Sequence, residues 1–430
     1  MMIRAAMIAL ASMGLFIVPV AAFAQDVARD GAAVAADTAW VMTATALVLM
    51  MTMPGLALFY GGLAQRRNVL SMLMQCLAVG CAASVLWLIG VYDLAFGAGN
   101  GWIGSLAEPF WSRARQARDG LPEVVFMTFQ MTFAMITPAL IIGAFAERMK
   151  FGAVVLWSCL WLVAVYAPVA HWIWGGGWLA QRGVIDFAGG LVVHATAGAS
   201  GLVIAIMLGP RHEFPSKPPH NPAMTFIGAA MLWVGWYGFN GGSALAADGS
   251  AGMAILVTHI SASTAALVWM AIERIRFGKS SLVGGVTGLI AGLACITPAS
   301  GSVGPLGALI LGLVAGVVCF IAVVLIKIRW RIDDSFDVFA VHGVGGIIGT
   351  LLVAVLMSSA LGGVGYGPAG FGSQVSIQVL GIVVVCVYSV VVSYSLAKIT
   401  AMVMGGLRVS DTDQLEGLDI TAHGERMNDT

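Results

Sequence analysis

Long apolar stretches follow one another along almost the whole chain, and this feature limits the fold more than any other. Each stretch is near the roughly 20 apolar residues that cross a bilayer as a helix. Eleven can be traced, at about 39 to 61, 70 to 97, 122 to 146, 151 to 171, 190 to 209, 223 to 242, 251 to 272, 282 to 298, 305 to 328, 336 to 358 and 374 to 403. They are too long and continuous for the short, alternating strands of a membrane barrel. We therefore predict an all-α polytopic membrane protein with eleven transmembrane helices.

The composition excludes several other classes of protein. Of the 430 residues only 10% are charged and 59% are hydrophobic, whereas ordinary soluble domains carry roughly 25% charged residues. The 21 basic and 21 acidic residues balance, so the chain lacks the basic excess expected of a nucleic-acid binder. A disordered chain would have fewer apolar residues. We expect no nucleic-acid partner.

The first residues have the pattern of a secretory signal peptide. Arg4 precedes an apolar run from 5 to 20, and Ala22-Phe23-Ala24 has the form of a cleavage site. We predict a signal peptide over 1–24, cleaved after Ala24, which would leave the new N-terminus outside the cytoplasm. The alternative is an uncleaved first span.

Basic residues predict the orientation of the spans. Most basic residues in the connections follow the first, third, fifth, seventh, ninth and eleventh apolar stretches, and these connections all lie on one side of the membrane. They are Arg66, Arg67, Arg148, Lys150, Arg211, Lys217, Arg274, Arg276, Lys279, Lys327, Arg329, Arg331 and Arg408. The positive-inside rule makes that side cytoplasmic. Arg113, Arg115 and Arg118 are exceptions in a long loop, and Arg182 is a single further one. We predict a multi-pass protein of the inner (plasma) membrane, with a periplasmic or extracellular N-terminus and a cytoplasmic C-terminus.

The cysteines give no sign of a metal site or of a disulfide framework. All six lie inside apolar stretches without zinc-type spacing, at Cys76, Cys81, Cys159, Cys295, Cys319 and Cys386. They are therefore interpreted as buried small hydrophobic residues. The chain also shows no set of nucleophile and base, so we expect neither a cofactor nor enzymatic activity.

A short motif occurs twice in the chain. Residues 193–198 and 341–346 both have the form Val-His-small-x-small-Gly, with Asp186 and Asp337 a short way upstream. Five stretches separate the two motifs, and an odd number of spans reverses orientation in the membrane. We predict two inverted five-helix halves followed by a C-terminal helix, with the substrate path between the halves.

The two repeated histidines are candidates for function. His194 and His342 lie inside apolar stretches, where an ionisable side chain is costly and is a functional hypothesis by default. The alternative is two separate core histidines, and the matched positions favour function. His259 has no such counterpart and is interpreted as a core histidine that is hydrogen-bonded to a neighbouring helix.

Aromatic residues at helical spacing accompany the histidines. Phe129 and Phe133 share one helix face, and Trp236, Phe239 and Ser243 share another. Such stripes usually serve packing, and Trp174 beside three glycines would by the same standard be an interfacial anchor.

A set of segments resembles the ammonium transporter family (Amt/Mep/Rh), bacterial Amt type. They lie at 54–62, 129–134, 143–148, 174–177, 186–190, 235–240 and 333–343, within a resemblance that covers about 36–425. The resemblance implies an eleven-helix homotrimer with one pore per subunit. The substrate would be ammonium or ammonia, with methylammonium as a further candidate.

The resemblance also implies roles for individual residues. Recruitment of ammonium falls to Phe129, Phe133, Trp174 and Ser243, the pore gate to Phe133 and Phe239, and the pore with its proton relay to His194 and His342; Asp186, Trp236 and Asp337 support them. Tyr237 stands where a phenylalanine is common in the family.

Physical chemistry then suggests how such a pore works. Moving an ion into a medium of low dielectric costs on the order of 20 kcal/mol in the idealised case, whereas neutral ammonia costs only a few kcal/mol. Ammonium should lose its proton near the outer mouth. Two neutral imidazoles in contact could pass that proton on separately, which would make uptake electrogenic.

The domain boundaries complete the expectation. Residues 25–406 would form the membrane domain, and 407–430 resemble the family's cytoplasmic regulatory tail, with a PII-type signal protein as a plausible partner. An ammonium sensor with the same pore fold and a passive ammonia channel are the alternatives. The tail is too short to hold an output domain, so a sensor would need a partner.

Overall fold

The computed structural model describes residues 31–427 except 119, 216–217 and 368–369. The predicted signal peptide lies outside these residues. Within them, ten helices are long and apolar enough to cross a membrane: Gly31–Leu63, Arg66–Phe96, Glu123–Ile142, Phe151–Gln181, Gly190–Leu208, Gly249–Phe277, Leu282–Ala299, Pro305–Arg329, Phe339–Leu356 and Gly370–Val403. The prediction of a polytopic helical membrane protein is confirmed.

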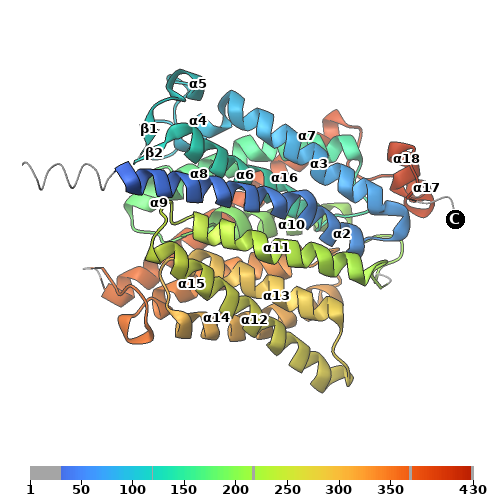
Figure 1. Ribbon diagram of the computed structural model, residues 1–430. Helices are drawn as coiled ribbons and strands as arrows, with labels where there is room; N and C mark the ends of the chain where they lie inside the picture. The colour runs from blue at the N-terminus through green and yellow to red at the C-terminus, as the bar shows by residue number, and fades with distance from the viewer. Residues whose placement is uncertain (1–30, 119, 216–217, 368–369, 428–430) are drawn as a thin grey trace, which may run out of the picture.

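One expected span is missing from those ten. The stretch predicted at 223 to 242 forms helix α11, Pro222–Gly242, which is long enough to span a bilayer. Its glycines and tryptophans, together with Tyr237 and Asn240, lower its mean hydropathy. In Figure 1 it lies among the other spans of the bundle.

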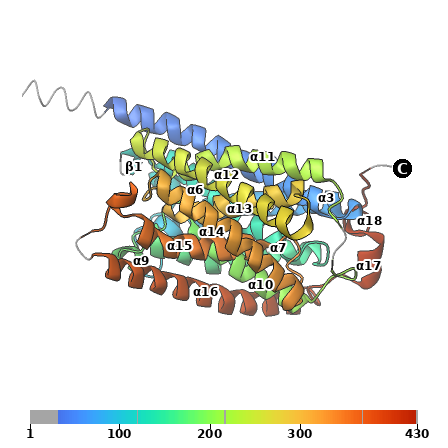
Figure 2. The same cartoon turned by 90° about the horizontal axis from the view of Figure 1, so that it is seen from below.

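The spans lie side by side, with short elements gathered at the two ends of the bundle (Figures 1 and 2). At one end, which we call the hairpin end, strand β1 (Ala117–Arg118) pairs antiparallel with β2 (Leu121–Pro122) near α5 (Phe110–Arg113). At the opposite end, the tail end, lie α17 (Asp411–Glu416) and α18 (Leu418–His423).

Most spans combine α-helix with short π-helical or 3-10 turns, either inside the span or at one of its ends. After the α-helical residues 31–50, the remaining elements are η1 (Met51–Leu56), α2 (Ala57–Leu63), η2 (Arg66–Asn68), α3 (Val69–Leu86), η3 (Trp87–Val91), α4 (Tyr92–Phe96), α6 (Glu123–Ile142), α7 (Phe151–Trp161), η4 (Leu162–Tyr166), α8 (Ala167–Ile173), α9 (Trp178–Gln181), η5 (Gly190–Ala195), α10 (Thr196–Leu208), α12 (Gly249–Phe277), α13 (Leu282–Ile296), η6 (Thr297–Ala299), α14 (Pro305–Val324), η7 (Leu325–Arg329), η8 (Phe339–Gly343), α15 (Val344–Leu356), η9 (Ser359–Leu361) and α16 (Gly370–Val403).

Two of the four arginines that broke the positive-inside pattern, Arg113 and Arg118, have acidic partners. Arg113 pairs with Asp93 at 2.6 Å and with Glu123 at 3.2 Å. Arg118 lies 3.8 Å from Glu123 and donates to the carbonyl of Phe96. Because these cations are neutralised locally, they weigh little against the basic residues at the tail end.

The cysteines are free, but the prediction that all are buried is wrong for half of them. Cys76, Cys295 and Cys319 are buried, whereas Cys81 is exposed and Cys159 and Cys386 are partly exposed. The surface of a membrane helix can be apolar, so an apolar stretch does not reveal which of its residues face outward.

Candidate functional site

The two repeated histidines meet in the interior of the bundle. His194 Nδ1 lies 3.3 Å from His342 Nδ1, and the rings are stacked with centroids 5.2 Å apart. Both side chains are buried. A contact between two ring nitrogens requires one to carry a hydrogen and the other to be bare. The pair can therefore hold one hydrogen between two neutral rings.

Each histidine lies in a π-helical turn that begins its span. His194 is in η5 and His342 in η8. Such turns are rare and are often found at functional sites. Helix α10, which follows η5, touches η8 through glycine, because a Cβ atom added to Gly198 would lie 2.3 Å from the Cα of Gly343. This close approach brings the two imidazoles into contact.

A buried aspartate holds the first of these turns. The carboxylate of Asp186 accepts hydrogen bonds from four successive backbone N–H groups, those of Gly189, Gly190, Leu191 and Val192, at 2.5 to 3.0 Å. These are the donors that the start of a helix leaves without intrahelical partners. Asp186 thus orients the turn that carries His194.

The corresponding residue before the second turn is Asp334. Its carboxylate accepts from the N–H groups of Val338 and Phe339 at 3.0 and 2.7 Å. The upstream counterpart of Asp186 was expected at Asp337, but Asp337 pairs with Lys327 at 2.8 Å instead. Asp334 precedes His342 by the same eight positions that separate Asp186 from His194. That spacing was the signal that could have identified it.

Both capping carboxylates lie before the first residue of the span they cap, and both titrate abnormally. Burial raises the pKa of Asp186, although its four backbone hydrogen bonds oppose the shift. Burial, and then the nearby negative charge of Asp337, raise the pKa of Asp334 to about 7. Removing a carboxylate from water disfavours its charged form.

A column of aromatic rings leads from the hairpin end to His194. Trp174 meets Phe133 edge-on with centroids 5.7 Å apart, and Phe133 packs on Phe239 at 4.3 Å. Phe239 then stacks on His194 at 6.0 Å. Phe129 flanks the column, 5.0 Å from Phe133. The three phenylalanines are buried, so the rings close this side of the histidine pair.

Polar groups accompany the column at Trp174 and at Phe239. The indole N–H of Trp174 donates to the carbonyl of Asp186 at 2.8 Å. The hydroxyl of Ser243 donates to the carbonyl of Phe239 at 2.8 Å. Because its hydrogen is used in that bond, the oxygen of Ser243 presents only acceptor lone pairs to other donors.

Trp236 supports His194 from a second side. Its ring stacks on the imidazole at 5.5 Å, and its indole N–H donates to the hydroxyl of Thr297 at 2.9 Å. The sequence reasoning did not identify Thr297, and no motif marks it. His259, interpreted as a core histidine bonded to a neighbouring helix, lies apart, and its Nδ1 is 2.7 Å from the hydroxyl of Tyr237 in α11.

A cavity of about 190 Å³ opens on the other side of the histidine pair. His342 and Val341 line it together with residues of α2 and α13, among them Phe59 and Thr287. Its remaining lining includes charged and polar groups near the tail end: Gln65, Arg211, Lys327, Ser335 and Asp337. We call this cavity the tail-end vestibule.

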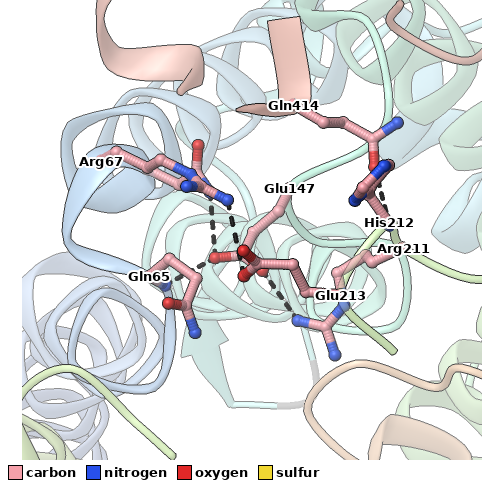
Figure 3. A pocket seen from close by; sticks show the side chains of 8 residues that line it. Gln65, Arg67, Glu147, Arg211, His212, Glu213 and Gln414 are labelled. Carbon is pink, nitrogen blue, oxygen red and sulfur yellow. Dashed lines mark hydrogen bonds and ion pairs between the residues drawn. The ribbon is translucent and has the colours of Figure 1, made fainter. Parts of the chain in front are cut away.

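A buried ionic network lies beside the vestibule. Arg211 pairs with Glu147 at 2.8 Å and with Asp333 at 2.9 Å, and Figure 3 shows Glu147 and Arg211 in the adjoining pocket. These carboxylates raise the pKa of Arg211 despite its burial, and the arginines lower the pKa of Asp333. Burial lowers the pKa of Arg148, which donates to the carbonyl of Asp333, to about 10.

The C-terminal segment docks onto this network. Residue Lys150 donates its backbone N–H to the carbonyl of Leu407 at 2.9 Å, and Val409 donates to Arg148 at 3.1 Å. Further along, Leu418 donates to the side chain of Asn68 at 2.8 Å. In Figure 3, Gln414 reaches the pocket beside His212. The segment is therefore packed on the bundle.

Known proteins resemble this chain over most of its length. The model of the Ammonium Transporter Family matches residues 39–428. An ammonium transporter of Bacillus subtilis (strain 168) is 42% identical over 382 residues, which are 87% of this chain and 94% of that protein. Ammonium transporter Amt1 of Archaeoglobus fulgidus is also 42% identical, over 87% of this chain and 94% of its own length.

Solved structures share the fold. A structure described as a sensor Amt protein superimposes with a TM-score of 0.86 at 29% identity, over 92% of this chain and all of that one. Candida albicans Mep2 gives a TM-score of 0.81 at 33% identity, over 88% of this chain and 87% of its own. Together with the family match, these similarities show that the chain, a multi-pass membrane protein, belongs to the ammonium transporter family.

Proposed function

We propose that this protein takes up ammonium by deprotonating it and conducting ammonia past the histidine pair. The observation that carries the proposal is the 3.3 Å contact between His194 and His342 at the end of the aromatic column. An intact ion would have to enter a closed, buried column of rings, at a desolvation cost of many kcal/mol. Neutral ammonia meets only the smaller cost of a polar group without partners.

The aromatic end of the column is suited to collecting the cation. Aromatic faces attract cations with about 0.5 to 2 kcal/mol each, and Trp174, Phe133 and Phe129 lie together there. Ser243 offers acceptor lone pairs. We assign recruitment to these four residues and the gate to Phe133 with Phe239, whose rings are 4.3 Å apart.

The histidines serve as the polar path through the apolar lumen. Among the described residues His194 Nε2 is buried without a hydrogen-bond partner, so it can bind a donor or acceptor that passes. The shared hydrogen between the rings provides a route for the proton, separate from that of ammonia. Uptake is then electrogenic, and potassium, which has no proton to release, is rejected.

The proposed topology follows from the same assignment. The hairpin end faces the periplasm or extracellular space, and the tail end faces the cytoplasm. The membrane domain covers 25–406 with eleven spans, α11 included, as two inverted halves plus a last helix. The matched caps of Asp186 and Asp334 support the inverted relation. A homotrimer in the inner (plasma) membrane completes the arrangement.

The docked tail, 407–430, is proposed to regulate transport. Its contacts with Arg148 and Lys150 attach it to the network beside the vestibule. A PII-type protein is the proposed partner at this face.

The decisive experiment compares charge movement with ammonia flux in proteoliposomes. On an ammonium pulse, an electrogenic transporter gives a current proportional to uptake, and a potassium pulse gives none. Ammonia flux without current would assign a passive channel. The likeness to a sensor Amt protein favours sensing as a second candidate; ammonium binding with neither flux nor current would assign that role.

A further inference from the structure

The tail-end vestibule contains one ion pair that the proposed transport mechanism does not use. Lys327 lies in η7, at the tail end of its span, and reaches the cavity that His342 also lines. Its Nζ atom is 2.8 Å from Oδ2 of Asp337. Lys327 is 23% and Asp337 18% exposed in their side chains, so both are accessible from the cavity mouth.

The lysine head group makes contacts that an ammonium ion could also make. Besides the carboxylate of Asp337, it donates to the carbonyl of Ser335 at 3.3 Å. A lysine side chain ends in a positively charged nitrogen with three N–H donors, and ammonium is the same group with a fourth hydrogen. The two oxygens form a cation site that already holds a tethered ammonium group.

Asp337 is the carboxylate available to a cation in this cavity. Among the described residues that line the vestibule it is the one acidic side chain. The guanidinium of Arg211 is committed to Glu147 and Asp333. Asp337 has a left-handed backbone with φ of 62°, which is uncommon for a residue other than glycine. Its backbone is therefore held in a costly conformation at the place where the carboxylate meets Lys327.

We propose that Lys327 occupies the Asp337 site in place of cytoplasmic ammonium, and so keeps the vestibule from holding the transported ion. The inference rests on the proposed function. Ammonia that has passed His342 takes up, in the vestibule, the proton that the histidine pair has passed on, and the ammonium so formed finds the carboxylate neutralised and leaves. Cytoplasmic ammonium meets the same obstacle in the reverse direction. Lys327 thus makes the two mouths of the pore unequal in their affinity for the cation.

The test uses right-side-out membrane vesicles, whose lumen faces the tail end. They are preloaded with ammonium at one buffered, acidic pH on both sides, and uptake of labelled methylammonium is measured. In Lys327→Met, the freed carboxylate should bind lumenal ammonium. The lumenal ammonium concentration that halves uptake should then fall about tenfold, because a hydrogen bond to a charged group contributes about this factor to binding. The external half-saturation should not change.

Matched variants separate this role from simple support. Lys327→Arg keeps the charge and should behave as the wild type, and the double variant K327M/D337N should restore wild-type insensitivity. Equal inhibition by lumenal ammonium in wild type and Lys327→Met would overturn the proposal. So would a fall in the half-inhibiting ammonium concentration of Lys327→Met that the added D337N substitution does not reverse. If Lys327→Met does not fold, Lys327→Gln replaces it, because its amide can still donate to Ser335.

A second readout does not depend on transport. In detergent-solubilised Lys327→Met, ammonium chloride should raise the thermal midpoint more than choline chloride does. The difference between the two salts should be larger than in the wild type, and K327M/D337N should not show this larger difference. If wild-type vesicles took up no methylammonium, this result would contradict the proposed function but not the inference about Lys327. The detergent measurement then decides on Lys327, and an equal gain in all variants would overturn the inference.

Discussion

The two approaches to the histidine pair differ in the kind of residue that lines them. From the hairpin end the approach is a stack of rings, in which Trp174 is partly exposed and Phe133 and Phe239 are buried. From the tail end it is an open cavity of about 190 Å³ whose mouth holds charged groups. Aromatic rings attract a cation while excluding its water, whereas fixed charges and space favour hydration. Under the proposed function, the aromatic end would therefore select the cation and the open end would release it.

The largest effect should come from removing what the two approaches share. Replacing both histidines, as in H194L/H342L, removes the polar path between column and vestibule, and ammonium-specific current in proteoliposomes should fall to background. His259→Leu, which changes a histidine outside the column, is the control and should leave current intact. Unchanged current in the double variant would sink the relay.

Removing aromatic rings from the column should weaken the affinity for ammonium more than it lowers the maximal current. Phe133→Ala and Trp174→Ala each remove a cation–π contact of about 0.5 to 2 kcal/mol, so half-saturation for ammonium should rise by roughly 2- to 30-fold. Currents measured over a range of ammonium concentrations test this. If half-saturation does not move in either variant, the two rings serve packing.

The capping aspartates offer a comparison of stability between the two ends. Asp186→Ala leaves four N–H groups without their acceptor and Asp334→Ala leaves two. Each buried donor left unpaired costs about 1–3 kcal/mol. The thermal midpoint in detergent should therefore fall further for Asp186→Ala. An equal or reversed order would show that the caps differ in solvent access.

A smaller effect should appear in the pH dependence of stability. The pKa of Asp334 is raised to about 7 in the folded protein, against about 3.9 for an unperturbed aspartate. Its neutral form is thus favoured on folding, and the stability it contributes is full below about pH 4 and lost as the pH rises to about 7. The thermal midpoint of the wild type minus that of Asp334→Asn should be larger at pH 5 than at pH 8. A difference that is independent of pH would contradict the shift.

The smallest change is expected from the tail. Deleting Arg408 to Thr430 removes the contacts on Arg148 and Asn68 but no part of the column or vestibule. Transport rate should change while the amount of protein in the membrane stays constant, as measured by uptake and immunoblotting of membranes. Equal transport after truncation would argue against regulation.

The sequence allowed prediction of those parts of the molecule that follow from hydropathy or from repeated motifs. Apolar stretches predicted the spans, and the repeat at His194 and His342 predicted two residues that the fold brings together. The assignment of Asp337 as the counterpart of Asp186 was wrong, because proximity to the motif was used instead of the eight-residue spacing that Asp334 satisfies.

Other features depend on packing that leaves no pattern along the chain. Thr297 reaches Trp236 from 61 positions away, and the exposure of Cys81 depends on which face of α3 turns outward. Lys327 was counted as a basic residue of a cytoplasmic connection. Its pairing with Asp337 depends on the fold, which places η7 beside the residues that precede η8.

The contact between Gly198 and Gly343 has a consequence for how this protein can vary. Because a Cβ on Gly198 would lie 2.3 Å from the opposite backbone, no side chain stands between the two helices that carry the histidines. The separation of the imidazoles is therefore set by contact between main-chain atoms of the two segments. A single methyl group added at Gly198 would push apart the two backbone segments that carry the histidines, and so would separate the two imidazoles.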